Sequence, residues 1–411
     1  MMNKIPKGWE VKKLKDIGKI SSGGTPSTSN DNNFGGNIAW ITPADLTGYK
    51  DKFISKGKRN LSEEGLKNSS AKILPKGTIL FSSRAPIGYV AIAQNEISTN
   101  QGFKNLTPNE SVISEYVYYY LLGSKNLAEQ SASGTTFKEI SATAFSNLPI
   151  PLPPLSEQKA IADKLDDSFA KIENAITNLI NAKENLKLYK QSVLKSAFNG
   201  DLLPNTSPTH WEVKKLGDFS EIKGGKRLPA NSKFSKDTTK FAYIRVADFE
   251  NMSVNLKDIK YITQEIQDKI KNYTISSDDI YISIAGTIGK VGTIPIELNG
   301  ANLTENAAKI TFNGANKKFL VYYLNSNEAQ MQIIFFTKAT TQAKLALYRI
   351  KEIKIPLPPL SEQNLIVAEI DRRFAIVDKT LNLIDKSIQN AKNLKQSILK
   401  KAFSGELRSE I

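Results

Sequence analysis

The strongest constraint on the fold is an internal repeat that divides the chain into two similar halves. PLPPLSEQ occurs at Pro151–Gln158 and again at Pro356–Gln363. The same offset separates KQSVLKSAF, which begins at Lys190, from KQSILKKAF, which begins at Lys395. Because these copies agree in length as well as in residues, we expect them to form the same structure twice.

The stretch before each PLPPLSEQ also repeats, with less similarity. WEVKKLKDIGKI begins at Trp9 and WEVKKLGDFSEI at Trp211, and AWITPADL from Ala39 resembles AYIRVADF from Ala242. The offset drifts along these stretches, which indicates loops of different length. The sequence therefore predicts a globular unit and a helical unit, each used twice. The predicted boundaries are 1–150 for the first globular domain, 151–204 for the first helix, 205–355 for the second domain and 356–411 for the second helix.

The segments after PLPPLSEQ have the periodicity of a coiled coil. Apolar residues follow one another at spacings of three and four, which is typical of a packing seam. Ser156 is expected to cap the first helix, and Asn199-Gly200 and Ser404-Gly405 to end the two helices. Each helix would span about 40 residues, or roughly 60 Å. The predicted seam residues are Ile161, Leu165, Phe169, Ile172, Ile176 and Leu179 in the first copy, and Ile366, Ile370, Phe374, Val377, Leu381 and Ile384 in the second.

Both helices have a wide apolar face that needs a partner. The other copy is the nearest candidate, and a two-fold pseudo-axis between the halves would make the pair antiparallel, with a domain near each end. Two unrelated surface helices are the alternative, but the matched lengths and seam phase speak against it. The polar outer positions leave open which face would dock other proteins.

The globular stretches have the pattern of a mixed α/β fold. β-rich runs at Ile79–Ser82 and Ile280–Ile284 are bounded by Gly, Pro and Asn turns, and short helices are expected at Glu115–Leu122 and Lys318–Leu324. There is no strict βαβ alternation, so a doubly wound sheet is not expected. The predicted fold class is mixed α/β (α+β), with two pseudo-symmetric globular domains separated by a long antiparallel two-helix coiled coil.

Composition narrows the functional classes. Lys and Arg number 56 against 41 Asp and Glu, a net charge of +15 that favours a polyanionic partner, although a generally basic proteome would give the same excess. The chain has no cysteine and one histidine, His210, which we expect at the surface near a domain boundary. Thiolate chemistry and His-rich metal sites are therefore excluded, and a Ser-His-Asp triad is improbable. No signal peptide or membrane-spanning stretch is apparent, so we expect a cytoplasmic protein without a membrane partner.

No catalytic or metal-binding constellation is predicted. An Asn/Asp-Pro-Pro-aromatic loop and a Gly-rich S-adenosylmethionine loop are both missing from the sequence. Gly286–Val291 lacks the spacing and the hydroxyl of a phosphate-binding loop, so we interpret it as a turn between strands. Asp278-Asp279 is interpreted as a solvated turn.

The duplicated PLPPLSEQ, the KQS-x-LKxAF-x-G helix end and the WEVKKL domain start resemble type I restriction–modification specificity (S) subunits, the HsdS family. The resemblance covers nearly the whole chain, and ITPADL, FSSRAPIG and ISTNQGF also look like segments of that family's first domain. It implies that each globular unit is a target-recognition domain for one half of a bipartite, asymmetric site in double-stranded DNA.

The resemblance also implies which partners the chain has. The helices would dock two modification (M) subunits, which carry S-adenosylmethionine and the methyl transfer. Two restriction (R) subunits would add ATP- and Mg-dependent translocation and cleavage. This chain would then be non-catalytic and hold no cofactor of its own.

Basic, amide-bearing and hydroxyl-bearing loop residues are the candidates for DNA contact. Structural alternatives exist: Asn100 could form a turn, Arg84 could pair with Asp45, and the threonine pairs could cap helices. The candidates are Gly24, Thr25, Arg84, Asn100, Gln101, Thr135, Thr136 and Lys138 in the first domain, and Lys223, Lys226, Arg227, Arg245, Asn306, Lys338, Thr340 and Thr341 in the second.

Two other functional classes remain open at this point. A coiled-coil adaptor could recognise proteins with its two domains, without sequence-specific DNA binding. A self-sufficient methyltransferase would bind a methyl donor on the isolated chain. The net charge and the loop composition speak against the adaptor, and the missing motifs speak against the enzyme.

Overall fold

The computed structural model describes residues 5–84, 86–134, 138–204, 210–337 and 343–407. The chain divides into two compact units. Unit 1 contains residues 1–179 and 386–411, and unit 2 contains residues 180–385. Each unit therefore combines one globular domain with part of each long helix, so the units are not consecutive stretches of sequence.

The long helices are α5, Leu155–Phe198, and α10, Leu360–Ser404. Each ends before a glycine whose φ is +81°, Gly200 and Gly405, as the predicted stops require. The predicted cap at Ser156 is wrong, because α5 already begins at Leu155. The Pro154 carbonyl accepts the first amides of the helix instead, at 3.0 Å from the backbone nitrogens of both Glu157 and Gln158.

The two helices run antiparallel within each unit. In unit 2, Lys183 pairs with Asp385 at 2.7 Å and Lys190 with Asp378 at 2.6 Å, so one number rises as the other falls. In unit 1, Glu173 pairs with Lys395, while residues nearer the start of α5 share a core with the end of α10. The predicted seam residues are all buried or half-buried: Ile161, Leu165, Phe169, Ile172, Ile176, Leu179, Ile366, Ile370, Phe374, Val377, Leu381 and Ile384.

The globular domain of unit 1 is built on a sheet with the strand order β2-β9-β6-β7-β4 and a smaller sheet β5-β3-β8, while β1 pairs with β10. The strands are β1 Glu10–Lys13, β2 Gly18–Ser22, β3 Phe34–Ile41, β4 Phe53–Ile54, β5 Arg59–Leu61, β6 Ile79–Ser82, β7 Val90–Ala93, β8 Ser98–Thr99, β9 Phe103–Pro108 and β10 Pro149–Leu152. The helices are α1 Glu63–Lys67, α2 Ser114–Gly123, α3 Lys125–Gln130 and α4 Ala142–Ser146, with 3-10 turns at Leu14–Asp16, Asp31–Asn33 and Pro43–Leu46.

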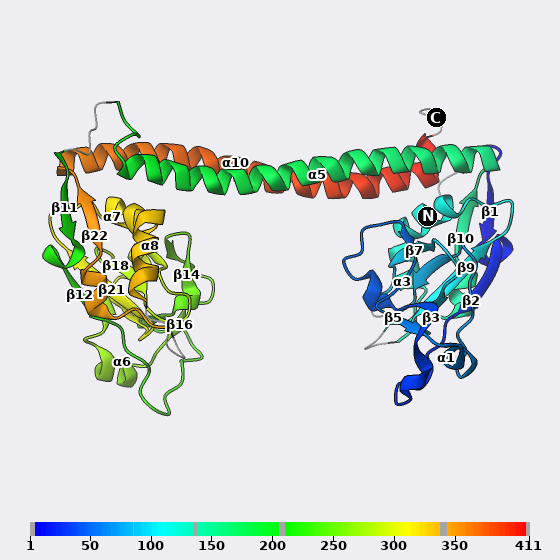
Figure 1. The fold of residues 1–411 in the computed structure, drawn as a ribbon, viewed down its shortest axis with the longest axis horizontal. Helices are drawn as coiled ribbons and strands as arrows, with labels where there is room; N and C mark the ends of the chain where they lie inside the picture. The colour runs from blue at the N-terminus through cyan, green and yellow to red at the C-terminus, as the bar shows by residue number, and fades with distance from the viewer. Residues whose placement is uncertain (1–4, 85, 135–137, 205–209, 338–342, 408–411) are drawn as a thin grey trace. The chain divides into compact units, whose positions relative to one another are not determined.

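The globular domain of unit 2 has sheets in the orders β12-β21-β18-β19 and β16-β13-β20-β17, and β11 pairs with β22 beside the helices (Figure 1). A β14-β15 hairpin completes it. The strands are β11 Glu212–Lys215, β12 Ser220–Gly224, β13 Ala242–Ile244, β14 Phe249–Glu250, β15 Ser253–Val254, β16 Lys260–Tyr261, β17 Thr274–Ile275, β18 Ile280–Ser283, β19 Val291–Thr293, β20 Ala301–Leu303, β21 Ala307–Phe312 and β22 Lys354–Leu357. The helices are α6 Gln264–Ile270, α7 Lys317–Leu324, α8 Asn327–Phe336 and α9 Leu347–Lys351, with 3-10 turns at Leu216–Asp218, Val246–Asp248 and Ile296–Leu298.

The sheets of the two domains share a common strand order, to which unit 1 adds β4 at the edge of one sheet and unit 2 adds β17 at the edge of the other. In both, the strand after the WEVKKL segment pairs antiparallel with a late strand, β2 with β9 and β12 with β21. In both, a middle strand pairs in parallel with a short one, β3 with β8 and β13 with β20. This confirms the predicted mixed α/β class and the repeat of the globular unit.

The end of PLPPLSEQ joins each domain to its helix. The indole Nε1 of Trp9 donates to Glu157 at 3.1 Å, and Trp211 donates to Glu362 at the same distance. His210 is exposed, as predicted, and its ring lies 3.1 Å from the same Glu362 carboxylate. The repeated tryptophan and glutamate are therefore a structural contact between the first strand of a domain and the helix that leaves it.

The glutamine of the motif also makes the same type of contact in both copies. Gln158 is 1% exposed and accepts from the Ile113 amide at 2.9 Å, at the start of α2. Gln363, also 1% exposed, accepts from the Asn316 amide at 2.8 Å, at the start of α7. Each buried amide thus satisfies a backbone donor that a helix N-terminus leaves without an intrahelical partner.

Among the described residues, no helix combines the length and the apolar character that crossing a membrane requires.

Candidate nucleic-acid interface

In each domain, two loops that carry predicted DNA-contacting residues are held together by backbone hydrogen bonds. In unit 1 the Gly24 amide, after β2, donates to the Thr99 carbonyl at 2.9 Å. In unit 2 the Lys226 amide, after β12, donates to the Leu303 carbonyl at 2.8 Å. The turn after the first sheet strand and the loop after β8 or β20 therefore form one surface in both domains.

A glycine lets the two loops approach this closely. A Cβ added at Gly23 would collide with the carbonyl oxygens of Thr99 and Asn100. A Cβ at Gly225 would collide with those of Leu303 and Thr304. The two glycines therefore occupy equivalent positions, and the residues that follow them can be matched one by one.

An aromatic side chain fixes the turn from below in both domains. The Trp40 indole on β3 donates to the Gly24 carbonyl at 3.0 Å, and the Tyr243 hydroxyl on β13 donates to the Lys226 carbonyl at 2.8 Å. Both side chains are buried. The backbone frame of this surface is thus repeated although its residues differ.

In unit 1 the surface is neutral at its centre. The Thr25 hydroxyl donates to the Gln101 side-chain oxygen, so these predicted residues meet across the two loops. The Asn100 side chain accepts from the Gly102 amide at 2.9 Å, which makes it a turn former, the structural alternative considered from the sequence. Gly24 is buried, while Gln101 is exposed.

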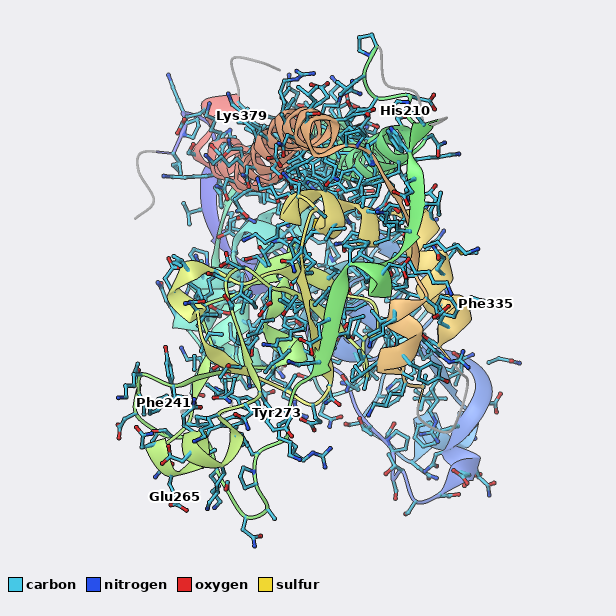
Figure 2. All side chains as sticks on the ribbon, turned by 90° about the vertical axis from the view of Figure 1, so that its left-hand side faces the viewer. His210, Phe241, Glu265, Tyr273, Phe335 and Lys379 are labelled. Carbon is cyan, nitrogen blue, oxygen red and sulfur yellow. The ribbon has the colours of Figure 1, made fainter. Side chains whose placement is uncertain are left out.

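In unit 2 the same positions carry charges. Arg227 Nε donates to Glu305 Oε1 at 2.7 Å, and the Lys226 ammonium lies 5.5 Å from the centre of the Tyr273 ring. Burial raises the pKa of Glu305, but hydrogen bonds from Arg227 and Thr304 outweigh it, so the pKa lies below its ordinary value. Figure 2 shows Tyr273 on the side of unit 2 opposite His210 and Lys379, which lie at the helices.

A hollow of about 600 Å³ opens beside this charged pair. Its lining includes the charged residues Lys226, Arg227, Glu305 and Lys344. The remaining lining residues are Gly224, Gly225, Ile284, Leu345, Ala346 and Leu347. A concave surface lined by both donors and an acceptor can bind a polar edge such as that of a base pair.

Arg84 pairs with a different carboxylate from the one considered in the sequence. Its guanidinium lies 3.4 Å from Glu139, which also receives the buried Lys104 at 3.3 Å. Asp45 instead accepts from Thr42, through the backbone amide at 2.8 Å and the hydroxyl at 2.7 Å. Arg84 therefore belongs to a charged cluster of unit 1 and is still partly exposed.

Arg245 is held more firmly than the other predicted cations. Its guanidinium lies 2.6 Å from Asp248 and 3.2 Å from Asp258, and hydrogen bonding to Asp248 raises its pKa. Lys223 is exposed and pairs with Glu221 at 3.0 Å. Arg245 is thus engaged within the domain, whereas Lys223 remains at the surface.

Asn306 and Lys138 are both exposed, and the Asn306 carbonyl accepts from the Ile284 amide at 2.8 Å. The other predicted DNA-contacting residues lie outside the described residues: Thr135, Thr136, Lys338, Thr340 and Thr341.

Sequence reasoning missed Glu305, Lys344 and Tyr273. Matching NQG after Thr99 with TEN after Leu303 would have aligned Gln101 with Glu305, because both glycine turns lean on the residues just before them. Tyr273 gives no such signal, since it reaches Lys226 from a part of the chain that has no close repeat.

The interpretation of Asp279 as part of a solvated turn is wrong, whereas that of Gly286–Val291 as a turn between strands agrees with the structure. Asp279 is 4% exposed and accepts from the Ser276 amide at 2.9 Å and the Thr311 hydroxyl at 2.5 Å, so it is a buried turn former and not solvated. The Gly286–Val291 stretch leads from β18 into β19, as interpreted from the sequence. Within the described ranges, no group of three or more His, Cys, Asp or Glu side chains could hold a metal ion.

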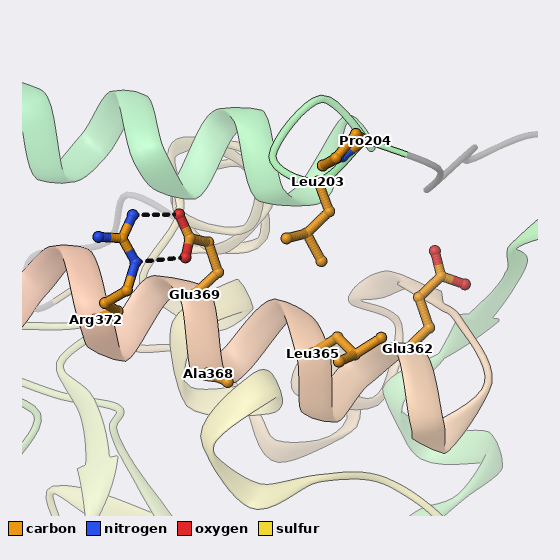
Figure 3. A pocket seen from close by; sticks show the side chains of 7 residues that line it. All are labelled: Leu203, Pro204, Glu362, Leu365, Ala368, Glu369 and Arg372. Carbon is orange, nitrogen blue, oxygen red and sulfur yellow. Dashed lines mark hydrogen bonds and ion pairs between the residues drawn. The ribbon is translucent and has the colours of Figure 1, made fainter.

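A second hollow, of about 450 Å³, lies beside α10 in unit 2 (Figure 3). Leu365, 61% exposed, faces it, and Glu369 pairs with Arg372 at its edge at 2.7 Å. Hydrogen bonds from Arg372 and Arg373 lower the pKa of Glu369 to about 2. We call this the α10 hollow; its lining residues are Leu203, Pro204, Glu362, Leu365, Ala368, Glu369 and Arg372.

Comparison with known proteins gives one consistent family. The model of the type I restriction modification DNA specificity domain matches twice, at residues 6–182 and 208–391. The chain is 33% identical to the type I restriction enzyme MjaIX specificity subunit of Methanocaldococcus jannaschii, over 100% of this chain and 96% of the relative. It is 24% identical to the EcoKI specificity subunit of Escherichia coli K12, over 99% and 91%.

Solved structures share the fold over the whole length. A chain studied for complex assembly and conformational transition of the type I R-M system matches with a TM-score of 0.76 and 21% identity, covering 98% of this chain and 99% of that one. The crystal structure of the HsdS subunit from Thermoanaerobacter tengcongensis matches with a TM-score of 0.60 and 22% identity, with the same coverage.

Proposed function

Because this chain belongs to the family of type I restriction–modification DNA specificity subunits, we propose that each of its globular domains recognises one half of a bipartite, asymmetric DNA site. The observation that carries the proposal is the surface formed by the two loops: its backbone frame is the same in both domains, while its side chains differ. Two domains with the same loop backbone but different side chains suit a DNA site whose two halves differ in sequence. The net charge of +15 suits a polyanionic partner.

The helices dock the catalytic partners in this proposal. Two modification subunits bring S-adenosylmethionine and the methyl transfer, and two restriction subunits bring ATP- and Mg-dependent cleavage, so this chain holds no cofactor. Apolar side chains at the surface of a helix pair support a protein partner there, because contact with another protein would remove them from water. The exposed ones are Leu155, Ile180, Leu188, Tyr189, Leu360, Leu365, Ile376, Leu383 and Leu394.

DNA reading is tested by mapping methylated bases in the genome of a host that carries the complete system. We expect one motif with two short, different half-sites and an unread spacer of constant length. Binding of the assembled complex to that motif should weaken steeply with salt, because phosphate contacts release counterions. Methylation without a motif, or binding to random-sequence DNA as tight as to the site, would contradict the proposal and favour a protein-binding adaptor.

Docking is tested by co-purification of the modification subunit with a Leu365→Asp variant. The charge placed at the α10 hollow should cut the recovered complex at least severalfold. Ile296→Asp is a matched control, since Ile296 is 71% exposed but lies on a 3-10 turn of the globular domain. Equal recovery of both variants would remove the α10 hollow from the interface. A labelled S-adenosylmethionine assay on the isolated chain should detect no binding.

A further inference from the structure

We propose that Arg227 and Glu305 read a G·C base pair in the half-site of unit 2, and that Thr25 and Gln101 read an A·T pair in the half-site of unit 1. The inference depends on the proposed function, because it assumes that these loops face the major groove. It adds what that function leaves open, namely which bases two equivalent positions prefer.

The two pairs stand at the same place in the repeated frame. Each first partner follows the turn glycine by two residues, and each second partner follows by two residues the strand-end carbonyl that accepts from the turn. In each pair the side chains meet directly, Thr25 with Gln101 and Arg227 with Glu305. Because the two pairs occupy equivalent positions, a difference in the bases they prefer can be assigned to their side chains.

The charged pair has the donor and acceptor pattern that a G·C pair requires. Guanine offers two acceptors to the major groove, N7 and O6, and the paired cytosine offers the N4 donor next to them. Arg227 bonds Glu305 through Nε, so its terminal nitrogens carry the remaining N–H donors on a side chain that is 78% exposed. The Glu305 carboxylate, which accepts from Arg227 and Thr304, can also accept from cytosine N4.

The neutral pair has the pattern of an A·T pair. Adenine offers the N7 acceptor and the N6 donor, which one side-chain amide can match with its own donor and acceptor. Gln101 supplies that amide, and Thr25 supplies a methyl group that can contact the thymine methyl. Neither side chain carries the paired donors that guanine N7 and O6 require.

Each pair also disfavours the other base pair. A thymine O4 acceptor opposite Glu305 would place two acceptors against each other, which costs binding without any steric clash. The contact between partners adds to selectivity, because a side chain already held by its neighbour loses less freedom when DNA binds.

The experiment exchanges the pairs in the full complex and maps methylation in vivo. R227T/E305Q should change the preference at one position of one half-site from G·C to A·T, by about 10- to 100-fold in relative methylation, the range of one bidentate base contact. T25R/Q101E should make the reverse change at one position of the other half-site. In both variants the remaining positions and the spacer should stay as in the wild type.

Two further variants separate base reading from charge and folding. Arg227→Lys keeps the ion pair but replaces the planar guanidinium by a single ammonium group, so the guanine preference should weaken while the complex still assembles; a preference that is unchanged both in this variant and in R227T/E305Q overturns the inference. Lys223→Ala, on the exposed side of β12, should weaken binding on all sequences equally and leave the motif unchanged. Arg227→Lys still tests the inference if a variant with an exchanged pair fails to fold.

The outcomes distinguish this inference from the proposed function. If the wild type methylates a bipartite motif but the Arg227→Lys and exchange variants methylate the same motif, the inference is wrong and the function stands. If the half-site altered by the Arg227 variants contains no G·C pair, the inference is also wrong. If the wild type methylates no bipartite motif, the proposed function itself fails.

Discussion

The two globular domains are alike where they meet the helices and unlike where two of their loops meet each other. In each domain a tryptophan, Trp9 or Trp211, donates to the glutamate of its own copy of the PLPPLSEQ motif. The motif glutamine, Gln158 or Gln363, accepts from a backbone amide at the start of a helix in its own domain. At the loops, by contrast, a neutral contact in unit 1 is replaced by an ion pair in unit 2. Contacts that hold a buried helix tolerate little change, whereas exposed loop side chains can change at small cost to stability.

A second site shows the same division. The charged cluster of unit 1 joins Arg84 and Glu139, which form a bridge beyond the end of β6, to the buried Lys104 on β9. At the equivalent register positions unit 2 has Ala285 and Ala308, and Lys344 forms the bridge that Glu139 forms in unit 1. The sheet is the same although the cluster is gone, so the charges are not what holds the strands in register.

The largest loss of stability is expected from replacing the phenylalanine near the C-terminal end of each long helix. Phe198 packs on Phe319 and Tyr323 of unit 2, at centroid distances of 5.3 and 5.0 Å. Phe198→Ala should lower the free energy of unfolding of unit 2 by about 3–4 kcal/mol, because it leaves a cavity in a packed core. Hydrogen exchange followed by mass spectrometry should locate the loss in residues 210–337.

The matching residue in the other copy acts on the other unit. Phe403 packs on Tyr116 and Tyr120, at 5.2 Å each, and is half-buried, so Phe403→Ala should cost unit 1 about 2 kcal/mol. Leu188→Ala is the control, since Leu188 is 68% exposed on α5. Exchange that increases first in the unit that does not contain the substituted side chain would break the comparison.

A smaller and equal effect is expected at the motif glutamines. Gln158→Ala and Gln363→Ala each remove a buried acceptor from a backbone amide, which should cost about 1–3 kcal/mol in both units. Chemical denaturation with hydrogen exchange as the readout measures both. Ser361→Ala is a control, because Ser361 is exposed at the start of α10. Clearly unequal costs for the two glutamines would show that the helix joints are not equivalent.

Alkaline pH should separate the units through their tyrosines. Burial raises the pKa of Tyr118 and Tyr120 on α2 to about 12, and it also raises those of Tyr116 and Tyr119. Burial also raises the pKa of Tyr49 in unit 1 and of four tyrosines in unit 2, namely Tyr243, Tyr281, Tyr322 and Tyr323, the last to about 12. A raised folded-state pKa gives stability that is complete below pH 10 and is lost as the pH rises towards 12.

Unit 1 has five such tyrosines against four in unit 2, so it should lose more stability between pH 10 and 12 and unfold first. Tryptophan fluorescence can follow the units separately: Trp211→Phe leaves the tryptophans of unit 1 as the signal, and a double Trp9→Phe, Trp40→Phe variant leaves that of unit 2. Simultaneous unfolding, or unit 2 unfolding first, would contradict this order.

Sequence periodicity and the repeat predicted the fold class, the long helices and the strands β6 and β18, since these depend on burial patterns with a fixed spacing. They did not predict that α5 begins at Leu155, because the carbonyl of Pro154, and not a side chain, receives the first amides. They predicted Thr25, Gln101 and Arg227 as surface candidates but not their partners. Glu305 was missed because an acidic residue is not expected at a DNA surface until its cation is seen beside it.

The smallest effect on stability is expected for the substitutions that should change base preference most. Arg227→Ala and Thr25→Ala should each alter the free energy of unfolding far less than Phe198→Ala does, because an exposed ion pair is screened by water and the neutral pair is also at the surface. Thermal unfolding of the two variants beside Phe198→Ala measures this directly. If Arg227→Ala proved as destabilising as Phe198→Ala, the charged pair would be part of the frame, and the contrast between a constant frame and a variable reading surface would no longer hold for unit 2.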